Sequence, residues 1–213
     1  MKDCLYIQEL YCVSPNGARV INGFSLKVSE KENVFIQAPE AWREALLDIV
    51  TGLRRPNRGT ISVCNELLYD RLEEEIAAFR CVHIGAVLAV NDFLPEVPLI
   101  DSLTLSLILS GMREENARDL IKRTTQKAIN SGILYTKPRF LFPIHIAAAA
   151  VIRAVSTDPE VLVFDDFVSR LDGKDQKRMW EIIRAIRPEN CAMVFMSSAA
   201  EPQEMAWTQS ISL

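Results

Sequence analysis

Two adjacent carboxylates, Asp165 and Asp166, follow directly on the apolar run at 161–164. A short apolar run of this kind is typical of a central parallel strand, so the pair is expected at a strand end. Carboxylates there could hold a magnesium ion, and one could act as a general base. The alternative is that they only cap neighbouring backbone. The catalytic interpretation needs a phosphate cradle nearby, because two carboxylates alone have nothing to activate.

The histidines and cysteines do not form a second group of candidate site residues in the sequence. His145 has no His, Cys or carboxylate partner at useful spacing and is expected at a helix start or an interface. His83 precedes an apolar run and is expected to be structural. The cysteines lie far apart, so we expect reduced thiols and no metal site. They are Cys4, Cys12, Cys64, Cys81 and Cys191.

Strands and helices alternate along the chain around these residues. Apolar alternation or short apolar runs predict strands at 5–10, 19–28, 33–37, 60–63, 161–164 and 192–196. Helical spacing of apolar residues predicts helices at about 40–50, 144–155 and 175–186, with a mainly helical middle at 91–137. This order predicts an α/β fold, with a mostly parallel sheet and antiparallel edge strands. We expect a single domain over 1–213, with an inserted helical subdomain at about 90–155.

Composition excludes several classes of protein. Of 213 residues, 49% are apolar and 24% are charged, which is typical of a globular domain. The net charge of -4 weighs against a nucleic-acid partner. No apolar run approaches the ~18 residues of a membrane span, so any membrane role is expected to come through a partner. The N-terminus has no signal-peptide pattern.

Several segments resemble the ATP-binding subunits of ABC transporters. The stretch 51–61 (TGLRRPNRGTI) resembles the region after the phosphate loop, and 158–166 (DPEVLVFDD) resembles the Walker B region. Residues 169–172 (SRLD) resemble the D-loop, while 84–87 and 93–95 resemble the Q-loop region. These segments occur in the family's order across nearly the whole chain. The resemblance implies a P-loop NTPase-like fold, closest in length to the ATPases of lipoprotein-release and cell-division systems.

The same resemblance places the phosphate loop at 37–44, where the expected residue types are absent. Such a loop needs glycines, so that backbone N–H groups can approach phosphate, followed by Lys and by Ser or Thr. Gln37 and Trp42 occupy the two glycine positions. Arg43 occupies the Lys position, and Glu44 replaces the hydroxyl that would bind Mg²⁺.

Backbone and charge in this segment also disfavour an anion. Pro39 removes a backbone donor. Glu40 and Glu44 place negative charge at the start of the following helix, where phosphate would otherwise bind. We therefore expect no phosphate binding there, and we expect Trp42 to fill the vacated pocket.

The remaining ATPase motifs are also altered, by resemblance. The signature motif aligns with 141–145 and lacks its glycines and serine; Phe142, Pro143 and His145 stand there. The Q-loop glutamine aligns with Ala89. Asp165 retains the Walker B position, and the following general base is shortened to Asp166. The switch histidine aligns with a serine. We interpret three residues as vestigial site positions: Asp165, Asp166 and Ser198.

These features predict a non-catalytic pseudo-ATPase subunit, without ATP or Mg²⁺ as cofactor, that scaffolds or regulates a membrane transporter complex. The alternative is an ABC transporter ATPase that binds and hydrolyses ATP through an altered site. Arg43 would then be the phosphate ligand and Asp166 the base. A relic serving an unrelated interaction is a third hypothesis.

The expected partners follow from the resemblance. They are a transmembrane permease subunit or another ABC ATPase subunit, with a homodimer left open and no nucleic acid. The segment 89–111 is the expected permease-facing surface. Its expected contact residues are Asn91, Phe93, Leu94 and Pro95. The chain is expected to be cytoplasmic and peripheral, on the cytoplasmic face of the membrane through its partner.

Overall fold

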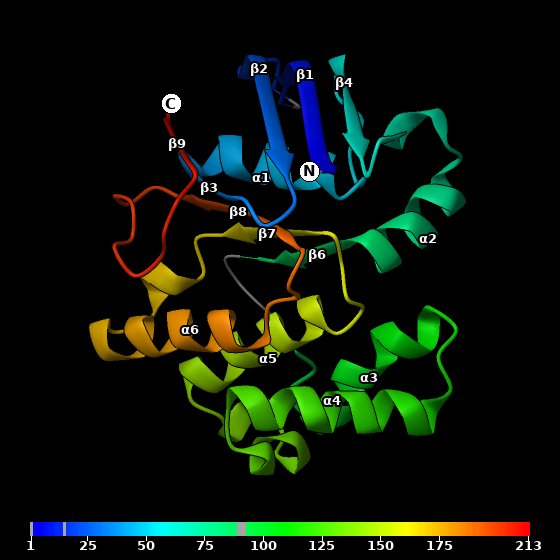
Figure 1. The fold of residues 1–213 in the computed structure, drawn as a ribbon, viewed down its shortest axis with the longest axis vertical. Coiled ribbons are helices and arrows are strands. Elements are labelled where there is room, and N and C mark those ends of the chain that lie inside the picture. The colour runs from blue at the N-terminus through cyan, green and yellow to red at the C-terminus, as the bar shows by residue number, and fades with distance from the viewer. Residues whose placement is uncertain (1, 15, 89–92) are drawn as a thin grey trace.

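The computed structural model describes residues 2–14, 16–88 and 93–213. Their elements form layers: an antiparallel sheet, the helix α1 (Glu40–Val50), a parallel sheet, and a set of helices (Figure 1). The predicted α/β class is confirmed. Ala89 and Asn91, named above for the Q-loop and the partner surface, lie outside the described residues.

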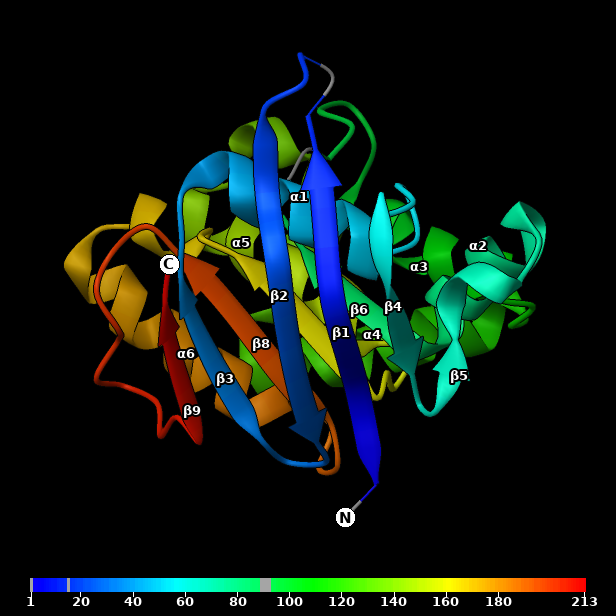
Figure 2. The same ribbon diagram turned by 90° about the horizontal axis from the view of Figure 1, so that it is seen from above.

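The antiparallel sheet has the strand order β2-β1-β4-β5. Its strands are β1 (Asp3–Val13), β2 (Arg19–Ser29), β4 (Arg58–Val63) and β5 (Glu66–Leu67). Buried and exposed residues alternate along β2, as expected where one face of a sheet packs on a core. Seen from above, β1 and β2 run side by side in opposite directions across the parallel strands (Figure 2).

The parallel sheet has the strand order β6-β7-β8-β3-β9. Its strands are β3 (Asn33–Gln37), β6 (Ile84–Val87), β7 (Val161–Asp165), β8 (Ala192–Ser197) and β9 (Gln209–Ser212). Every residue of β7 and β8 is buried, as is typical of central parallel strands. All pairings are parallel, so the carboxyl ends of β3, β7 and β8 share one edge.

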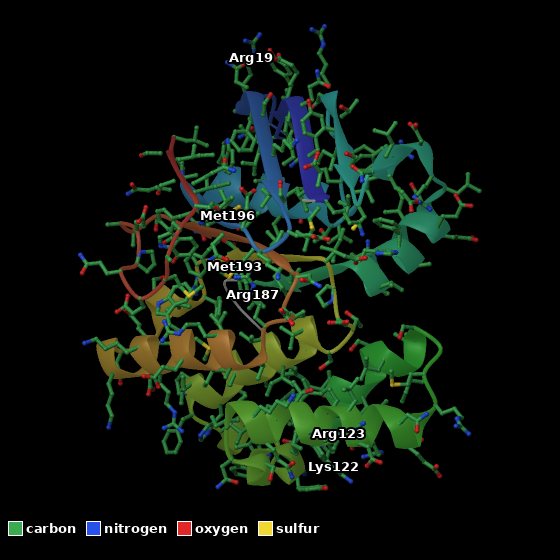
Figure 3. The ribbon with its side chains drawn as sticks, in the orientation of Figure 1. Arg19, Lys122, Arg123, Arg187, Met193 and Met196 are labelled. Atoms are coloured by element: carbon green, nitrogen blue, oxygen red, sulfur yellow. The ribbon has the colours of Figure 1, made fainter. Side chains whose placement is uncertain are left out.

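The two faces of the parallel sheet contribute to separate cores. Met193 of β8 belongs to the core on the helical side, and Met196 belongs to the core shared with α1 and the antiparallel sheet. Both lie at the centre of the molecule, between Arg19 at one end and Lys122 and Arg123 at the other (Figure 3). The antiparallel strands form a sheet of their own, whereas the sequence predicted them at the edges of a mostly parallel sheet. A helix separates the two sheets: seven of the eleven residues of α1 are buried.

The other face is covered by α3 (Leu99–Leu109), α4 (Glu114–Ala128), α5 (Pro143–Val155) and α6 (Gly173–Ile186). The alanines at 147–150 are buried, which confirms their predicted packing within the domain. A Cβ on Gly85 of β6 would lie 2.4 Å from the carbonyl oxygen of Ala154, so this glycine lets α5 lie close to the sheet. The helical subdomain at about 90–155 stays a prediction.

Two kinds of element were not predicted. The helix α2 (Glu73–His83) buries only Ile76 and Phe79, so its apolar periodicity is weak, and β9 consists mainly of polar residues. Short 3₁₀ turns complete the fold: η1 (Leu68–Asp70), η2 (Ser131–Tyr135), η3 (Pro138–Phe140) and η4 (Val168–Arg170). Over the described ranges, the helices are too short or too polar to cross a membrane.

Candidate functional site

The candidate site lies where β3, β7 and β8 end. Asp165 is the last residue of β7 and pairs in register with Met196 of β8. The N–H of Asp166 donates to the carbonyl oxygen of Met196 at 2.8 Å, and Asp166 has a positive φ of 33°. Ligands of open parallel sheets bind outside the carboxyl ends of the strands, so these carboxylates have the expected location.

The guanidinium of Arg43 reaches this edge from α1. Its Nε donates to Asp165 Oδ1 at 2.7 Å, and its Nη2 lies 3.7 Å from Asp166 Oδ2. Its Nη1 donates to the carbonyl oxygen of Ala38 at 2.8 Å. The Arg43 and Asp165 side chains are only 4% and 5% exposed. The cation at the predicted Lys position is therefore surrounded by oxygen atoms of the protein itself.

Asp166 is held by two serines at the end of β8. Ser197 Oγ donates to Asp166 Oδ1 at 2.8 Å, and Ser198 Oγ donates to Oδ2 at 3.1 Å. The backbone N–H of Ser198 also points at Oδ2, at 3.3 Å. The structure thus brings together Asp165, Asp166 and Ser198, the three residues interpreted from the sequence as vestigial site positions. Ser197 was missed, although its position beside Ser198 at a strand end could have drawn attention to it.

Burial dominates the titration of Asp165. It raises the pKa of this carboxyl above its usual value, while the hydrogen bond and charge of Arg43 oppose the shift. We treat Asp165 as ionised at neutral pH, because its partner at 2.7 Å is a guanidinium that does not deprotonate in proteins.

The segment predicted as a phosphate loop is mostly helical. The helix α1 begins at Glu40, so only Ala38 and Pro39 separate it from β3. The N–H groups of Trp42 and Arg43 both donate to the carbonyl oxygen of Pro39 at 3.1 Å. The N–H of Ala38 donates to the carbonyl oxygen of Ser197 at 2.9 Å. These donors bind other protein atoms and therefore do not form an anion cradle.

Other side chains of the segment point away from phosphate chemistry. Glu40 and Glu44 are exposed in the first turns of α1. Gln37 Nε2 donates to the carbonyl oxygen of Ser198 at 3.3 Å. Trp42 is buried, and its ring packs against that of Phe24 of β2 in a T-shaped contact, with ring centroids 4.9 Å apart. The side chain that contacts the carboxylates is Arg43, and the role of Trp42 as a plug stays a prediction.

The altered signature lies at the start of α5. Phe142 is 71% exposed, and its ring lies 5.7 Å from that of His145. Pro143 is the first residue of the helix. The Nδ1 of His145 is buried without a hydrogen-bond partner. Burial, followed by the charge of Arg178, lowers the pKa of His145. In the described part of the chain, no hydrogen bond or ion pair joins these residues to the carboxylates of β7.

The described part of the predicted partner surface is strongly apolar. Phe93 is half-buried and lies under the guanidinium of Arg153, at 4.9 Å. Leu94 is 67% exposed, and Pro95 is also exposed. On α3, Leu105 and Leu109 are 53% and 73% exposed. Exposed leucines on neighbouring turns of one helix form the kind of patch that protein interfaces use.

No protein-family model matches the chain, but curated relatives do. The lipoprotein-releasing system ATP-binding protein LolD of Chromohalobacter salexigens is 22% identical over 199 residues, which cover 92% of this chain and 84% of that protein. The uncharacterized ABC transporter ATP-binding protein YknY of Bacillus subtilis is 22% identical, covering 92% and 85%. The ergothioneine transport ATP-binding protein EgtV of Helicobacter pylori is 22% identical, covering 95% and 93%.

Solved structures agree with these relatives. A dimeric ATP-binding cassette in a post-hydrolysis state, bound to ADP and Pi, superposes with a TM-score of 0.81 at 19% identity, covering 92% of this chain and 88% of its own. The cbiO1 protein of Clostridium perfringens, part of an ABC transporter complex, superposes with a TM-score of 0.80 at 15% identity, covering 93% and 80%. The chain therefore has the fold of an ABC ATPase cassette, and its homologues are ABC transporter ATP-binding proteins.

Proposed function

We propose that this chain is the cassette subunit of an ABC transporter complex, and that its own nucleotide site neither binds Mg-ATP tightly nor hydrolyses it. The observation that carries the second part is the buried ion pair between Arg43 and Asp165. The two groups that would meet phosphate and Mg²⁺ already neutralise each other. ATP and Mg²⁺ are therefore not expected as cofactors of this chain.

Nucleotide would have to break this ion pair. If Arg43 turned toward a phosphate, Asp165 would remain as a buried carboxylate without its 2.7 Å partner. Removing one partner of a buried pair costs about 3 to 5 kcal/mol. At about 1.4 kcal/mol per tenfold change, affinity would fall roughly a hundredfold to several thousandfold. A magnesium ion bound by Asp165 would displace Arg43 and leave that guanidinium buried beside a divalent cation.

The backbone supplies little compensation. The N–H groups of Ala38, Trp42 and Arg43 already bind protein carbonyl oxygens. Glu44, in the position of the magnesium-binding hydroxyl, is exposed and acidic. A carboxylate about 4 Å from a phosphate charge costs roughly 1 kcal/mol in water and about 4 kcal/mol near a protein surface. The residues present therefore do not fit Mg-ATP.

A second candidate is an ATPase with an altered site. The comparisons favour it at the level of the family, since the relatives named above are ATP-binding proteins. It requires Arg43 to leave Asp165 and become a phosphate ligand. It also requires Asp166 to act as a base, although Ser197 and Ser198 donate to both of its carboxylate oxygens.

The exposed face of α3 and the residues before it support a membrane partner. Leu94, Leu105 and Leu109 leave large apolar surfaces in water. We propose that a permease subunit covers them, together with Phe93 and Pro95, and that Asn91 belongs to the same contact. The chain would then be peripheral, on the cytoplasmic face of the membrane. Another ABC ATPase subunit, or a second copy of this chain, would be its partner across the cassette dimer.

Calorimetric titration of the purified chain with Mg-ATP tests the proposal, with LolD of Chromohalobacter salexigens as positive control. We expect no saturable heat at millimolar nucleotide and no rise in thermal midpoint, because a ligand stabilises only the state that it binds. Micromolar binding, together with phosphate release that Arg43→Ala and Asp166→Asn abolish, would establish the second candidate in its place.

A further inference from the structure

Three potential metal ligands meet at the opposite end of the parallel sheet. Cys64 lies in the turn between β4 and β5, His83 is the last residue of α2, and Glu160 precedes β7. The Cys64 Sγ, one imidazole nitrogen of His83 and one carboxylate oxygen of Glu160 all lie within 4.8 Å of one another. They come from three separate segments, so local sequence proximity does not explain their convergence.

Cys64 is fixed by a tight turn. Both Cys64 and Asn65 have left-handed backbones, with φ values of 53° and 66°, as in the two-residue turns that join antiparallel strands. The N–H of Cys64 donates to the carbonyl oxygen of Cys4 at 2.9 Å. The thiol is therefore held on the rigid edge of the antiparallel sheet.

His83 and Glu160 are positioned as firmly. The His83 ring stacks on Phe79, with centroids 4.2 Å apart, and Phe79 also carries the guanidinium of Arg71 at 4.6 Å. His83 Nδ1 lies 2.9 Å from Glu160 Oε2. The carbonyl oxygen of Glu160 accepts the N–H of Ala192 at 2.9 Å, which ties this residue to the parallel sheet.

We propose that Cys64, His83 and Glu160 form a three-ligand binding site for Zn²⁺, with water as the fourth ligand. Sulfur, imidazole nitrogen and carboxylate oxygen are the donor types that zinc takes, and three protein ligands leave one tetrahedral position open. Calcium and magnesium prefer oxygen donors alone. All three residues are half-buried, so the ion could enter from solvent and still be shielded.

The three ligands would balance the charge of a divalent cation once Cys64 loses its proton. A thiolate and a carboxylate would together neutralise Zn²⁺. Burial raises the pKa of Cys64 to about 12, and Glu160 adds to this shift, so zinc must displace the thiol proton on binding. Lys2 Nζ, 3.8 Å from Glu160 Oε1, weakens the site only modestly, because this lysine is 44% exposed.

Bound zinc would join the antiparallel sheet, α2 and the parallel sheet at one point. Glu160 and Asp165 lie at opposite ends of β7, which at about 3.3 Å per residue places the two sites roughly 16 Å apart. The zinc site is therefore separate from the Arg43–Asp165 site at the other end of the strand. The simpler interpretation is a His83–Glu160 pair, with the Cys64 thiol beside Glu160, that binds no metal.

Titration of the reduced, untagged full chain with CoCl₂ distinguishes these interpretations. We expect one Co²⁺ per chain, with a thiolate-to-cobalt charge-transfer band and the visible bands of tetrahedral cobalt, all removed by equimolar ZnCl₂. Cys64→Ser should abolish the charge-transfer band. His83→Gln and Glu160→Gln should each weaken cobalt binding at least about tenfold.

The matched control is Cys81→Ser, which removes a half-buried thiol on α2 and should leave the spectrum unchanged. Absence of cobalt binding at micromolar concentration would overturn the proposal. A charge-transfer band that survives Cys64→Ser, or that Cys81→Ser removes equally, would also overturn it. Circular dichroism of each variant shows that it is folded, so loss of binding reports on the ligand.

Discussion

Arg43 Nε lies 2.7 Å from Asp165 Oδ1, although 122 positions separate the two residues in the chain. This contact connects the first turn of α1 to the carboxyl end of β7, between the two sheets. Both side chains are nearly inaccessible to water. The ion pair thus stabilises the packing of α1 in the region where a catalytic cassette would bind phosphate and magnesium. Arg43 and Asp165 cannot keep this contact and also bind phosphate and Mg²⁺.

Arg43→Ala should lower the free energy of unfolding by about 3 to 5 kcal/mol, because it leaves Asp165 buried without a counter-charge and beside Asp166. Urea denaturation followed by circular dichroism measures this loss. The control is Arg58→Ala, which removes an exposed arginine of β4 and should change stability by less than about 0.5 kcal/mol.

A double variant tests whether the ion pair itself, rather than either side chain alone, contributes to stability. Arg43→Met combined with Asp165→Leu replaces both charges with apolar side chains, which is often close to neutral for a buried pair. We expect it to recover more than half of the stability lost in Arg43→Ala. If the effects of Arg43→Met and Asp165→Leu simply add in a double-mutant cycle, the two residues are not energetically coupled and the ion pair is not what holds this site closed.

Trp42→Ala should lower the free energy of unfolding by about 3 to 5 kcal/mol, because it removes a buried ring that makes a T-shaped contact with Phe24. Leu53→Ala, at a residue that is 66% exposed, is the control. The variant should still bind no Mg-ATP, because Arg43 remains paired with Asp165. Saturable ATP binding by Trp42→Ala would instead identify the tryptophan as the plug of the nucleotide pocket.

Most of the fold could be predicted from the sequence, because its apolar periodicities are strong. The helix α1 begins and ends where its spacing predicted, at Glu40 and Val50. Two sheets could not be distinguished from one with antiparallel edges, since alternation shows that a face is buried and not what covers it. The helix α2 begins with three glutamates and buries little, so its periodicity gave no clear signal.

The candidate site was only partly predictable. The motifs named Asp165, Asp166 and Ser198 separately, and the structure places them side by side. That Arg43 pairs with Asp165 could not be read from residue types, because a cation in this position also suits a phosphate. The sequence did not predict the convergence of Cys64, His83 and Glu160, because these three residues are far apart in the chain and meet only in the folded structure.

Leu105→Glu combined with Leu109→Glu should leave the thermal midpoint nearly unchanged, because both leucines are more than half exposed. The double variant should lose the permease subunit that we propose to cover α3. Affinity capture from detergent-solubilised membranes, with mass spectrometry of the captured proteins, measures this. The wild-type chain should capture a protein with membrane spans, and Leu67→Glu on β5 should capture it equally. Equal capture by the α3 variant would place the permease contact elsewhere.

His145 should make folding stability depend on pH. Its pKa in the folded chain is lowered from 6.5, first by burial and then by Arg178, with Asp175 opposing. The folded state therefore favours the neutral ring, and its buried Nδ1 has no acceptor for a second proton. The contribution to stability is complete above pH 6.5 and is lost as the pH falls through that value toward the folded pKa.

Thermal unfolding at two pH values measures this loss. Between about pH 7.5 and about pH 5.5, the thermal midpoint should fall further for the wild-type chain than for His145→Gln. An equal fall in His145→Gln would show that other groups govern this range.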